Sequence, residues 1–285
     1  MLVPDTRSHG THDETPQSKR VASGNAFFGN QICGMFPVDG SGSVDTIVTA
    51  SKLTKRYRAH TALDGVSFEL HKGEIVGLLG LNGAGKSTTL SLLTGRLLPD
   101  EGSVSILGHD LSTDLREAQA CFGFLPEGAP LFEDLTVEAH LKTLAGLRRG
   151  ISEDDVSSAI KRFNLENVRT KTIETLSKGY KRRTALAGAF LGNPKILFLD
   201  EPTDGLDPFQ KDSVLESLAR HRDEQTLLIS THSLEDVGAI CDRIIVLSAG
   251  KKVFDDRTIA LAARAPDGTL KTAFADLLQD AEALS

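Results

Sequence analysis

The sequence has few of the features that mark secreted or membrane-spanning proteins. Its three cysteines, Cys33, Cys121 and Cys241, form no C-x-x-C pair and no even-numbered disulfide framework. We therefore expect reduced thiols, as in an intracellular protein. No apolar run approaches the roughly 18 residues that a bilayer-spanning helix needs, and the first residues lack the apolar core of a signal peptide. If the protein serves a membrane process, we expect the membrane part to be another chain.

An excess of positive charge is also missing. The formal net charge is −7, so no global basic field would attract nucleic acid, and we expect no nucleic-acid partner. Local basic clusters are still compatible with this balance. The composition, 40% hydrophobic and 25% charged, is that of an ordinary globular protein, and 285 residues are ample for a buried core.

The chain divides into three parts by composition and pattern. Residues 1–45 are rich in Gly, Ser, Thr, Asp and Pro without a helical or strand period, which predicts a disordered N-terminal tail. His9 and His12 could bind a metal there, but no cysteine or carboxylate arrangement completes a site, and a solvated tail is the favoured interpretation. Residues 46–256 are predicted to form the main domain and residues 257–285 a short helical C-terminal tail.

The main domain alternates apolar strands with helical segments, which predicts an α/β fold around a parallel sheet. Two earlier runs, Ile47–Leu53 and Val66–Leu70, alternate as strands of a half-exposed sheet do. A charged helical stretch without strands predicts an inserted helical subdomain at about residues 131–180. The buried strands are expected at 74–79, 195–201, 226–232 and 243–248, with helices near 209–221 and 234–241.

A glycine-rich loop follows the first buried strand and opens a helical segment, which is the order of a phosphate-binding P-loop. Glycines let backbone N–H groups surround phosphate oxygens, and the helix N-terminus adds a positive dipole end. Lys86 is expected to reach the β- and γ-phosphates, and the Ser87 hydroxyl to ligate Mg²⁺. The alternative is a glycine turn between core elements. The predicted nucleotide-binding residues are Gly80, Leu81, Asn82, Gly83, Ala84, Gly85, Lys86, Ser87 and Thr88.

Polar residues end two later apolar strands. Asp200 is placed to hold Mg²⁺ through a water molecule, and Glu201 to reach the water that attacks the γ-phosphate. The alternative for this pair is a strand end capped by solvated charge. His232 follows another apolar strand and could hydrogen-bond the γ-phosphate and hold the water against Glu201. An isolated histidine could instead be structural.

Two further features have open interpretations at this point. Tyr57 lies in a basic, polar connection between the first two strands and could stack on a purine or simply pack at the surface. Ser177 is a credible helix N-cap at an anion site. The basic cluster that follows it is most simply a solvated helix face, and a nucleic-acid role is the lesser alternative; it comprises Lys178, Lys181, Arg182 and Arg183.

Together these motifs resemble the nucleotide-binding subunits of ATP-binding cassette (ABC) transporters, over about residues 47–253. The resemblance implies a P-loop NTPase of the ABC type, with a parallel-sheet core, an antiparallel β edge and an inserted helical subdomain. It implies a head-to-tail dimer that encloses ATP and Mg²⁺, and it supports Tyr57 as the adenine-stacking aromatic. Ser177 and Gly179 would then contact the γ-phosphate of the other subunit's ATP, and Asp207 would lie at the dimer seam.

Two departures from the family pattern stand out. The signature usually reads Leu-Ser-Gly-Gly-Gln, and here Lys178 and Tyr180 replace its third and fifth residues while Ser177 and Gly179 are kept. Glu127 stands where the family usually has a glutamine that serves the metal and the water. A glutamate oxygen can still ligate Mg²⁺, but it adds negative charge near the γ-phosphate.

These departures resemble the branch of ATPases that pair with separately encoded export permeases. The implied function is ATP binding and hydrolysis that energises a membrane exporter, by a homodimer or heterodimer attached to the cytoplasmic face of the cell membrane. The alternative is a soluble ABC-type ATPase in macromolecular assembly. The cargo is not identified, because specificity in such systems lies in the permease.

Overall fold

A computed structural model describes residues 45–58, 60–220, 222 and 224–283 of the chain. The predicted N-terminal tail, with His9 and His12, lies outside the described residues except for Asp45, and so does Cys33. All elements named below belong to one compact unit of the chain.

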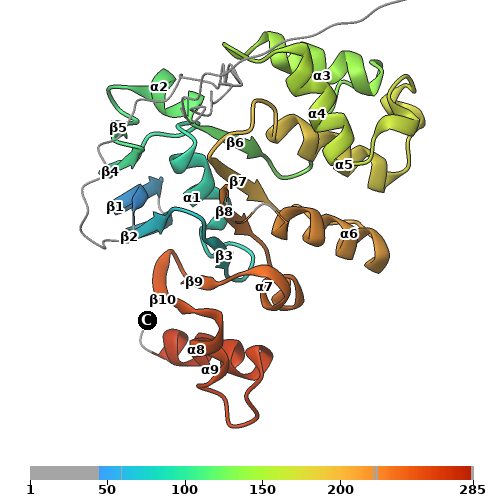
Figure 1. Cartoon of the computed structure of the whole chain (residues 1–285). Helices are drawn as coiled ribbons and strands as arrows, with labels where there is room; N and C mark the ends of the chain where they lie inside the picture. Colours follow the sequence, from blue (N-terminus) through green and yellow to red (C-terminus); the bar gives the residue numbers. More distant parts are fainter. Residues whose placement is uncertain (1–44, 59, 221, 223, 284–285) are drawn as a thin grey trace, which may run out of the picture. The chain divides into compact units, whose positions relative to one another are not determined.

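A six-stranded sheet forms the centre of the fold (Figure 1). Five of its strands are parallel, and β10 runs antiparallel to β9 at one edge. This confirms the predicted α/β class with a parallel core and an antiparallel edge. In the order β10-β9-β3-β8-β7-β6, the strands span Lys251–Arg257, Arg243–Ser248, Ile75–Leu79, Thr226–Ser230, Ile196–Asp200 and Phe122–Leu125.

Both faces of this sheet are buried, and successive side chains enter two different cores. In β7, Leu197 and Leu199 belong to one apolar cluster, whereas Ile196 and Phe198 belong to the other. This follows from the two-residue period of a strand. Every residue of β3, β7 and β8 is buried, so neither face of these strands meets water, which explains why their central residues are apolar.

A separate antiparallel sheet of four strands, in the order β2-β1-β4-β5, lies on one side of the central sheet. Its strands are β1 (Thr46–Tyr57), β2 (His60–His71), β4 (Glu101–Ile106) and β5 (His109–Asp110). The expected strands at residues 47–53 and 66–70 are present but longer. The prediction that Tyr57 lies in a connection is wrong, because pairing of Lys55, Arg56 and Tyr57 with β2 extends β1 to that residue.

Helix α1 (Lys86–Leu93) fills the space between the two sheets. Its residues Leu90, Leu92 and Leu93 share a cluster with Val48 of β1 and Phe198 of β7. The short helix α2 (Leu115–Ala120) adds Ala118 to the same cluster. The glycine-rich loop that precedes α1 is therefore fixed at both ends by buried elements.

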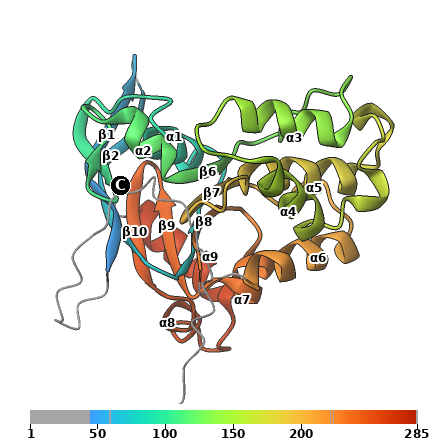
Figure 2. The same ribbon diagram turned by 45° about the horizontal axis from the view of Figure 1, so that its top comes forward.

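The helical insertion is a group of three helices, α3 (Val137–Gly146), α4 (Glu153–Arg162) and α5 (Lys178–Ala189), which Figures 1 and 2 show side by side. Two short 3-10 helices, η1 (Glu166–Val168) and η2 (Ile173–Thr175), connect α4 to α5. Local capping sets the boundaries. Ser152 and Asp155 form a reciprocal capping box at the start of α4, and Thr136 caps α3.

The remaining helices pack on the second face of the central sheet. They are α6 (Pro208–Ala219), α7 (Leu234–Ile240), α8 (Thr258–Ala262) and α9 (Leu270–Ala283). The sequence patterns did not predict α8 or strand β10. Leu261 of α8 and Leu277 of α9 are buried in the same cluster as the sheet, so this C-terminal segment packs on the domain. Among the residues described above, no helix is both long enough and apolar enough to cross a bilayer.

Gly123 in β6 provides a test of this packing. A Cβ there would overlap the Ala189 carbonyl oxygen at the end of α5, so Gly123→Ala forces the strand and helix apart. We expect it to lower the free energy of unfolding by about 3 kcal/mol. Gly146→Ala is the matched control, because nothing lies within 4 Å of the added Cβ; it should change stability by less than about 1 kcal/mol. Urea unfolding measures both, and equal stabilities would contradict the packing described.

His140 of α3 predicts a pH dependence. Its side chain is buried, its Nδ1 accepts a hydrogen bond from the Phe132 N–H (3.4 Å), and burial lowers its pKa below the ordinary 6.5. The neutral imidazole therefore stabilises the fold fully above pH 6.5, and stability falls as the pH drops below that value, by at most about 1.4 kcal/mol per pH unit. His140→Gln keeps an acceptor but does not titrate. Urea unfolding at pH 7.5 and pH 5.5 should show the wild type losing more stability than the variant, and equal losses would refute the assignment.

Candidate nucleotide site

The candidate site lies where β3, β7 and β8 end. These strands are adjacent and parallel, so their carboxyl ends meet at one edge of the sheet. The loop 80–85 follows β3, Asp200 is the last residue of β7 and Ser230 is the last residue of β8. Asp200 and Ser230 are paired in register.

The glycine-rich loop has the backbone geometry that the sequence predicts. Gly83 and Gly85 have φ values of 82° and 109°, which residues with a side chain rarely adopt. A Cβ on Gly85 would lie 2.7 Å from both the Ala62 carbonyl oxygen and Leu63 Cδ2. Helix α1 begins at Lys86, and no side chain caps its first N–H groups. Those N–H groups are suited to phosphate oxygens.

Lys86 is held against this loop. Its side chain is 8% exposed, and its Nζ donates hydrogen bonds to the carbonyl oxygens of Gly80 (2.7 Å) and Leu81 (3.2 Å). Burial lowers the pKa of Lys86, and three nearby carboxylates oppose that shift. In order of effect these belong to Glu201, Asp200 and Glu127. The structure thus brings these three predicted acidic residues near one ammonium group.

Asp200 is buried and chemically suited to a metal ion. Burial raises its pKa, the Ser230 and Ser87 hydroxyls act in the opposite direction, and the charges of Glu127 and Glu201 raise it further. Its Oδ1 is a buried oxygen with no hydrogen-bond partner among the described residues. Hydroxyl and carboxylate oxygens are the donors that Mg²⁺ prefers, so Ser87, Asp200 and Glu127 fit this ion.

Protein groups alone do not complete a metal cage. Across the described part of the chain, no three His, Cys, Asp or Glu residues are grouped as metal ligands. Mg²⁺ commonly keeps several waters and binds through one or two carboxylates together with substrate phosphates. The oxygen donors at Asp200 and Ser87 agree with that mode of binding.

Glu201 and His232 contact each other directly. His232 Nδ1 lies 2.9 Å from Glu201 Oε1, although the two residues follow different strands. Glu201 has a φ of 47°, an unfavourable conformation for a glutamate, and its N–H donates to the Ser230 carbonyl oxygen (2.9 Å). The structure therefore pairs the two predicted catalytic residues. The sequence predicts His232 at the end of a strand, whereas the structure places it two residues beyond the end of β8.

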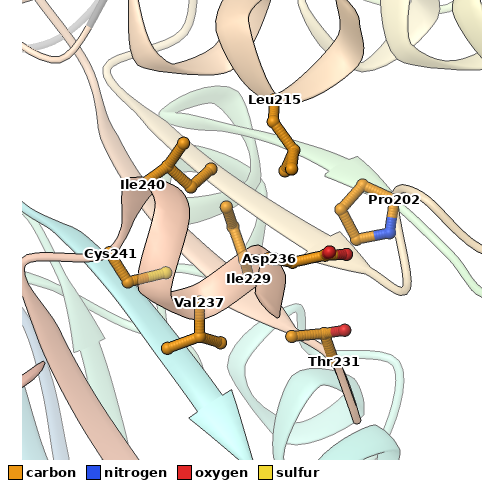
Figure 3. Close-up of a pocket in the computed structure, with 8 residues that line it drawn as sticks. All are labelled: Pro202, Leu215, Ile229, Thr231, Asp236, Val237, Ile240 and Cys241. Carbon is orange, nitrogen blue, oxygen red and sulfur yellow. The ribbon is translucent and has the colours of Figure 1, made fainter. Parts of the chain in front are cut away.

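A buried carboxylate behind this pair was missed by the sequence reasoning. Asp236 of α7 is 3% exposed and accepts hydrogen bonds from Thr203 Oγ1 (2.5 Å) and Ser233 Oγ (2.8 Å), while Lys211 Nζ of α6 lies 2.5 Å from it. Figure 3 shows Asp236 beside Pro202 and Thr231 where α6, α7 and the strand ends meet. The Ser-x-x-Asp spacing of a capping motif was the available sequence signal.

The basic cluster of α5 is not uniformly solvated, so that prediction is wrong for Arg182. Its side chain is 7% exposed, and Nε donates to the Pro202 carbonyl oxygen (2.7 Å). Lys181 forms an ion pair with Glu133 (2.8 Å), and the Arg183 guanidinium lies 4.3 Å from the centre of the Tyr180 ring. Lys178 is exposed.

Ser177, Gly179 and Asp207 lie apart from the loop and the catalytic pair. Ser177 is the N-cap of α5 and accepts from the Tyr180 N–H, as predicted. Gly179 is buried under Gln210 of α6, and Asp207 caps α6 by accepting from the Gln210 N–H (3.0 Å). In the described part of the chain, no hydrogen bond or ion pair joins these three residues to Lys86, Asp200, Glu201 or His232.

Tyr57 ends β1 and is 44% exposed, with Lys55 Nζ 5.9 Å from the centre of its ring. A ring exposed to this extent is available to a purine, and equally to solvent. The predicted role in adenine stacking remains a prediction.

Comparison with known proteins gives a consistent family. The ABC transporter family profile matches residues 63–204. ATP-binding cassette sub-family A member 2 from Rattus norvegicus is 37% identical, and the match covers 72% of this chain and 9% of that protein. Probable multidrug ABC transporter ATP-binding protein YbhF from Escherichia coli K12 is 34% identical over 83% of this chain and 42% of its own length. The chain thus spans less than half the length of these two relatives.

Two solved structures share the fold over nearly their whole length. One is described as the structure of an ATP-binding subunit of an ABC transporter; it has a TM-score of 0.73 and 30% identity, covering 81% of this chain and 99% of that one. The other is a dimeric structure of a post-hydrolysis state of the ATP-binding cassette MJ0796 bound to ADP and Pi. It has a TM-score of 0.68 and 26% identity, and the match covers 74% of this chain and 98% of that one. The motifs, the fold and these matches agree: the chain belongs to the ABC transporter family, as an ATP-binding domain of the P-loop α/β type.

Proposed function

We propose that this chain binds ATP with Mg²⁺ and hydrolyses it as the energising subunit of a membrane exporter. The observation that carries the proposal is the 2.9 Å contact between His232 and Glu201 beside Lys86 and Asp200. A carboxylate held by an imidazole next to a phosphate-binding lysine suits the activation of a water for attack on phosphorus.

Each residue has a role that follows from its position. Backbone N–H groups of residues 80–88 and the Lys86 ammonium bind the phosphates, and Tyr57 offers a face to the adenine. Ser87, Asp200 and Glu127 would hold Mg²⁺, which when bound neutralises phosphate charge. Glu201 accepts the proton of the attacking water. His232 orients Glu201 through its Nδ1 and presents its other ring nitrogen to the γ-phosphate.

We propose that two chains complete the site. Within the described residues, no hydrogen bond joins Ser177 or Gly179 to the Lys86 loop of its own chain, so their helix start is available to the ATP of a second subunit. The likeness to the dimeric MJ0796 cassette supports this arrangement. Asp207, exposed at the start of α6, would lie at the seam of a homodimer or heterodimer.

The partner that we propose in the membrane is a permease on a separate chain. The similarity to the probable multidrug ABC transporter ATP-binding protein YbhF supports an export role, and we place the chain in this proposal on the cytoplasmic face of the membrane. The helical group α3–α5 offers a docking surface that includes two exposed apolar side chains, Phe132 just before it and Leu147. ATP-driven closure of the dimer would switch the permease between two states.

Glu201→Gln separates binding from hydrolysis. The amide keeps the size and one acceptor of the side chain but cannot take a proton, so we expect kcat to fall about 100-fold or more while the ATP Kd stays within about twofold. Light scattering in ATP should show a trapped dimer. Glu166→Gln, the same change at an exposed residue of η1, is the control and should match the wild type. A variant that still hydrolyses ATP would refute the role of Glu201, and a monomer in ATP would refute the shared site.

The membrane partner can be tested separately. The affinity-tagged chain, expressed in its own cells and purified from detergent-solubilised membranes, should bring down a polytopic membrane protein, identified by mass spectrometry. Leu147→Glu places a charge on the exposed apolar surface and should reduce that recovery several-fold, with ATP binding unchanged. Recovery of soluble partners alone would contradict the exporter and favour an ATPase in macromolecular assembly.

A further inference from the structure

The turn that follows β7 is anchored from both sides. It begins at Glu201 and closes with a hydrogen bond from the Asp204 N–H to the Glu201 carbonyl oxygen (3.1 Å). On one side Thr203 donates to the buried Asp236 of α7 (2.5 Å). On the other side Arg182 of α5 donates to the Pro202 carbonyl oxygen (2.7 Å). The position of Glu201 therefore depends on two helices that belong to different parts of the fold.

Arg182 is an unusual anchor, because its charge is buried and forms no ion pair with any residue that the structure describes. Its side chain is only 7% exposed. One terminal nitrogen of the guanidinium has no hydrogen-bond partner among the described residues. The carboxylates that act on it electrostatically are, in order, those of Asp204, Glu201 and Asp200. Burying an arginine is costly when its donors are unfilled. The guanidinium thus brings a hydrogen bond to the turn and a positive charge near these carboxylates.

The same helix carries the residues proposed to contact the second subunit's ATP. Ser177 caps α5 and Gly179 lies in its first turn, whereas Arg182 lies five residues after the cap and contacts the turn of its own chain. The second half of α5 is packed into the fold, because its residues from Thr184 to Ala189 are all buried. Close packing resists bending, so a displacement at the start of α5 is expected to carry the Arg182 side chain with it.

We propose that Arg182 is a positioning residue that couples the seating of α5 to the placement of Glu201. This inference rests on the proposed ATPase function and on the role of Glu201 in it. Contact of Ser177 and Gly179 with the second ATP would fix α5, and Arg182 would then hold the 201–204 turn in the conformation needed for hydrolysis. Glu201 has an unfavourable positive φ, so it needs such support from outside its own strand.

The test compares Arg182→Met, Arg182→Lys and Arg162→Met in the full chain. Arg162 is the matched control: its guanidinium also has a buried nitrogen without a partner, it packs over Phe190 (4.2 Å), and it donates to Gln225 (2.7 Å), contacts outside the proposed site. Steady-state ATP hydrolysis gives kcat and KM, equilibrium binding gives ATP affinity and stoichiometry, and thermal unfolding gives Tm. Hydrogen exchange by mass spectrometry reports the Thr203 and Asp204 amides.

We expect Arg182→Met to lower kcat about tenfold to a hundredfold, since small misplacements of a catalytic group have effects of this size. KM, ATP affinity and binding stoichiometry should change less than about twofold, and exchange of the Thr203 and Asp204 amides should rise. Arg182→Lys should recover part of kcat, because an ammonium keeps a charge and a donor. Arg162→Met should lower Tm without changing kcat or the exchange of that turn.

Two outcomes overturn the proposal. Equal kcat in Arg182→Met and wild type would show that the turn does not need this anchor. A loss of kcat that matches a loss of binding stoichiometry, without faster exchange in residues 203–204, would assign Arg182 to general stability. If the wild type itself binds ATP but does not hydrolyse it, the proposed function fails first, so the two failures are distinguishable.

Discussion

Burial of both faces of the six-stranded sheet is the constraint on which the rest of this structure depends. Every residue of β3, β7 and β8 is buried, so no side chain within these strands reaches solvent. Function is therefore confined to the strand ends, where Asp200 and Ser230 are paired and the glycine-rich loop begins. The two apolar clusters fix this edge from opposite sides, so the site is assembled by packing before any ligand binds.

The parts of the fold that the sequence predicts are those with local, periodic signals. The continuous apolar run of β7 and the capped start of α5 at Ser177 were found within a residue or two. Strand β10 was missed because its alternation is weak and its pairing with β9 is set by a turn at residues 249–250 rather than by apolar pattern. The extension of β1 to Tyr57 was missed because its last residues are polar and are held only by pairing with β2.

The candidate site divides in the same way. Lys86, Asp200, Glu201 and His232 were predicted because each follows or ends an apolar strand, and parallel strands bring such residues together. Arg182 was assigned to solvent because it lies in a run of basic residues, and only the approach of α5 to the turn after β7 makes it buried. A contact between residues distant in sequence leaves no local signal in a single chain.

The polar residues behind the site determine how it can move. Asp236 binds Thr203 from the turn after β7, Ser233 from the segment after β8 and Lys211 from α6. Breaking one of these contacts would leave a buried charge partly unpaired, which is costly, so the three segments are expected to shift together. Glu201 and His232 are then expected to stay paired when α6 and α7 move with these segments. Among the described residues, Arg182 makes the hydrogen bond that joins α5 to the turn after β7. Movement of the helical group α3–α5, rather than of the strand ends, is therefore what can change the placement of Glu201.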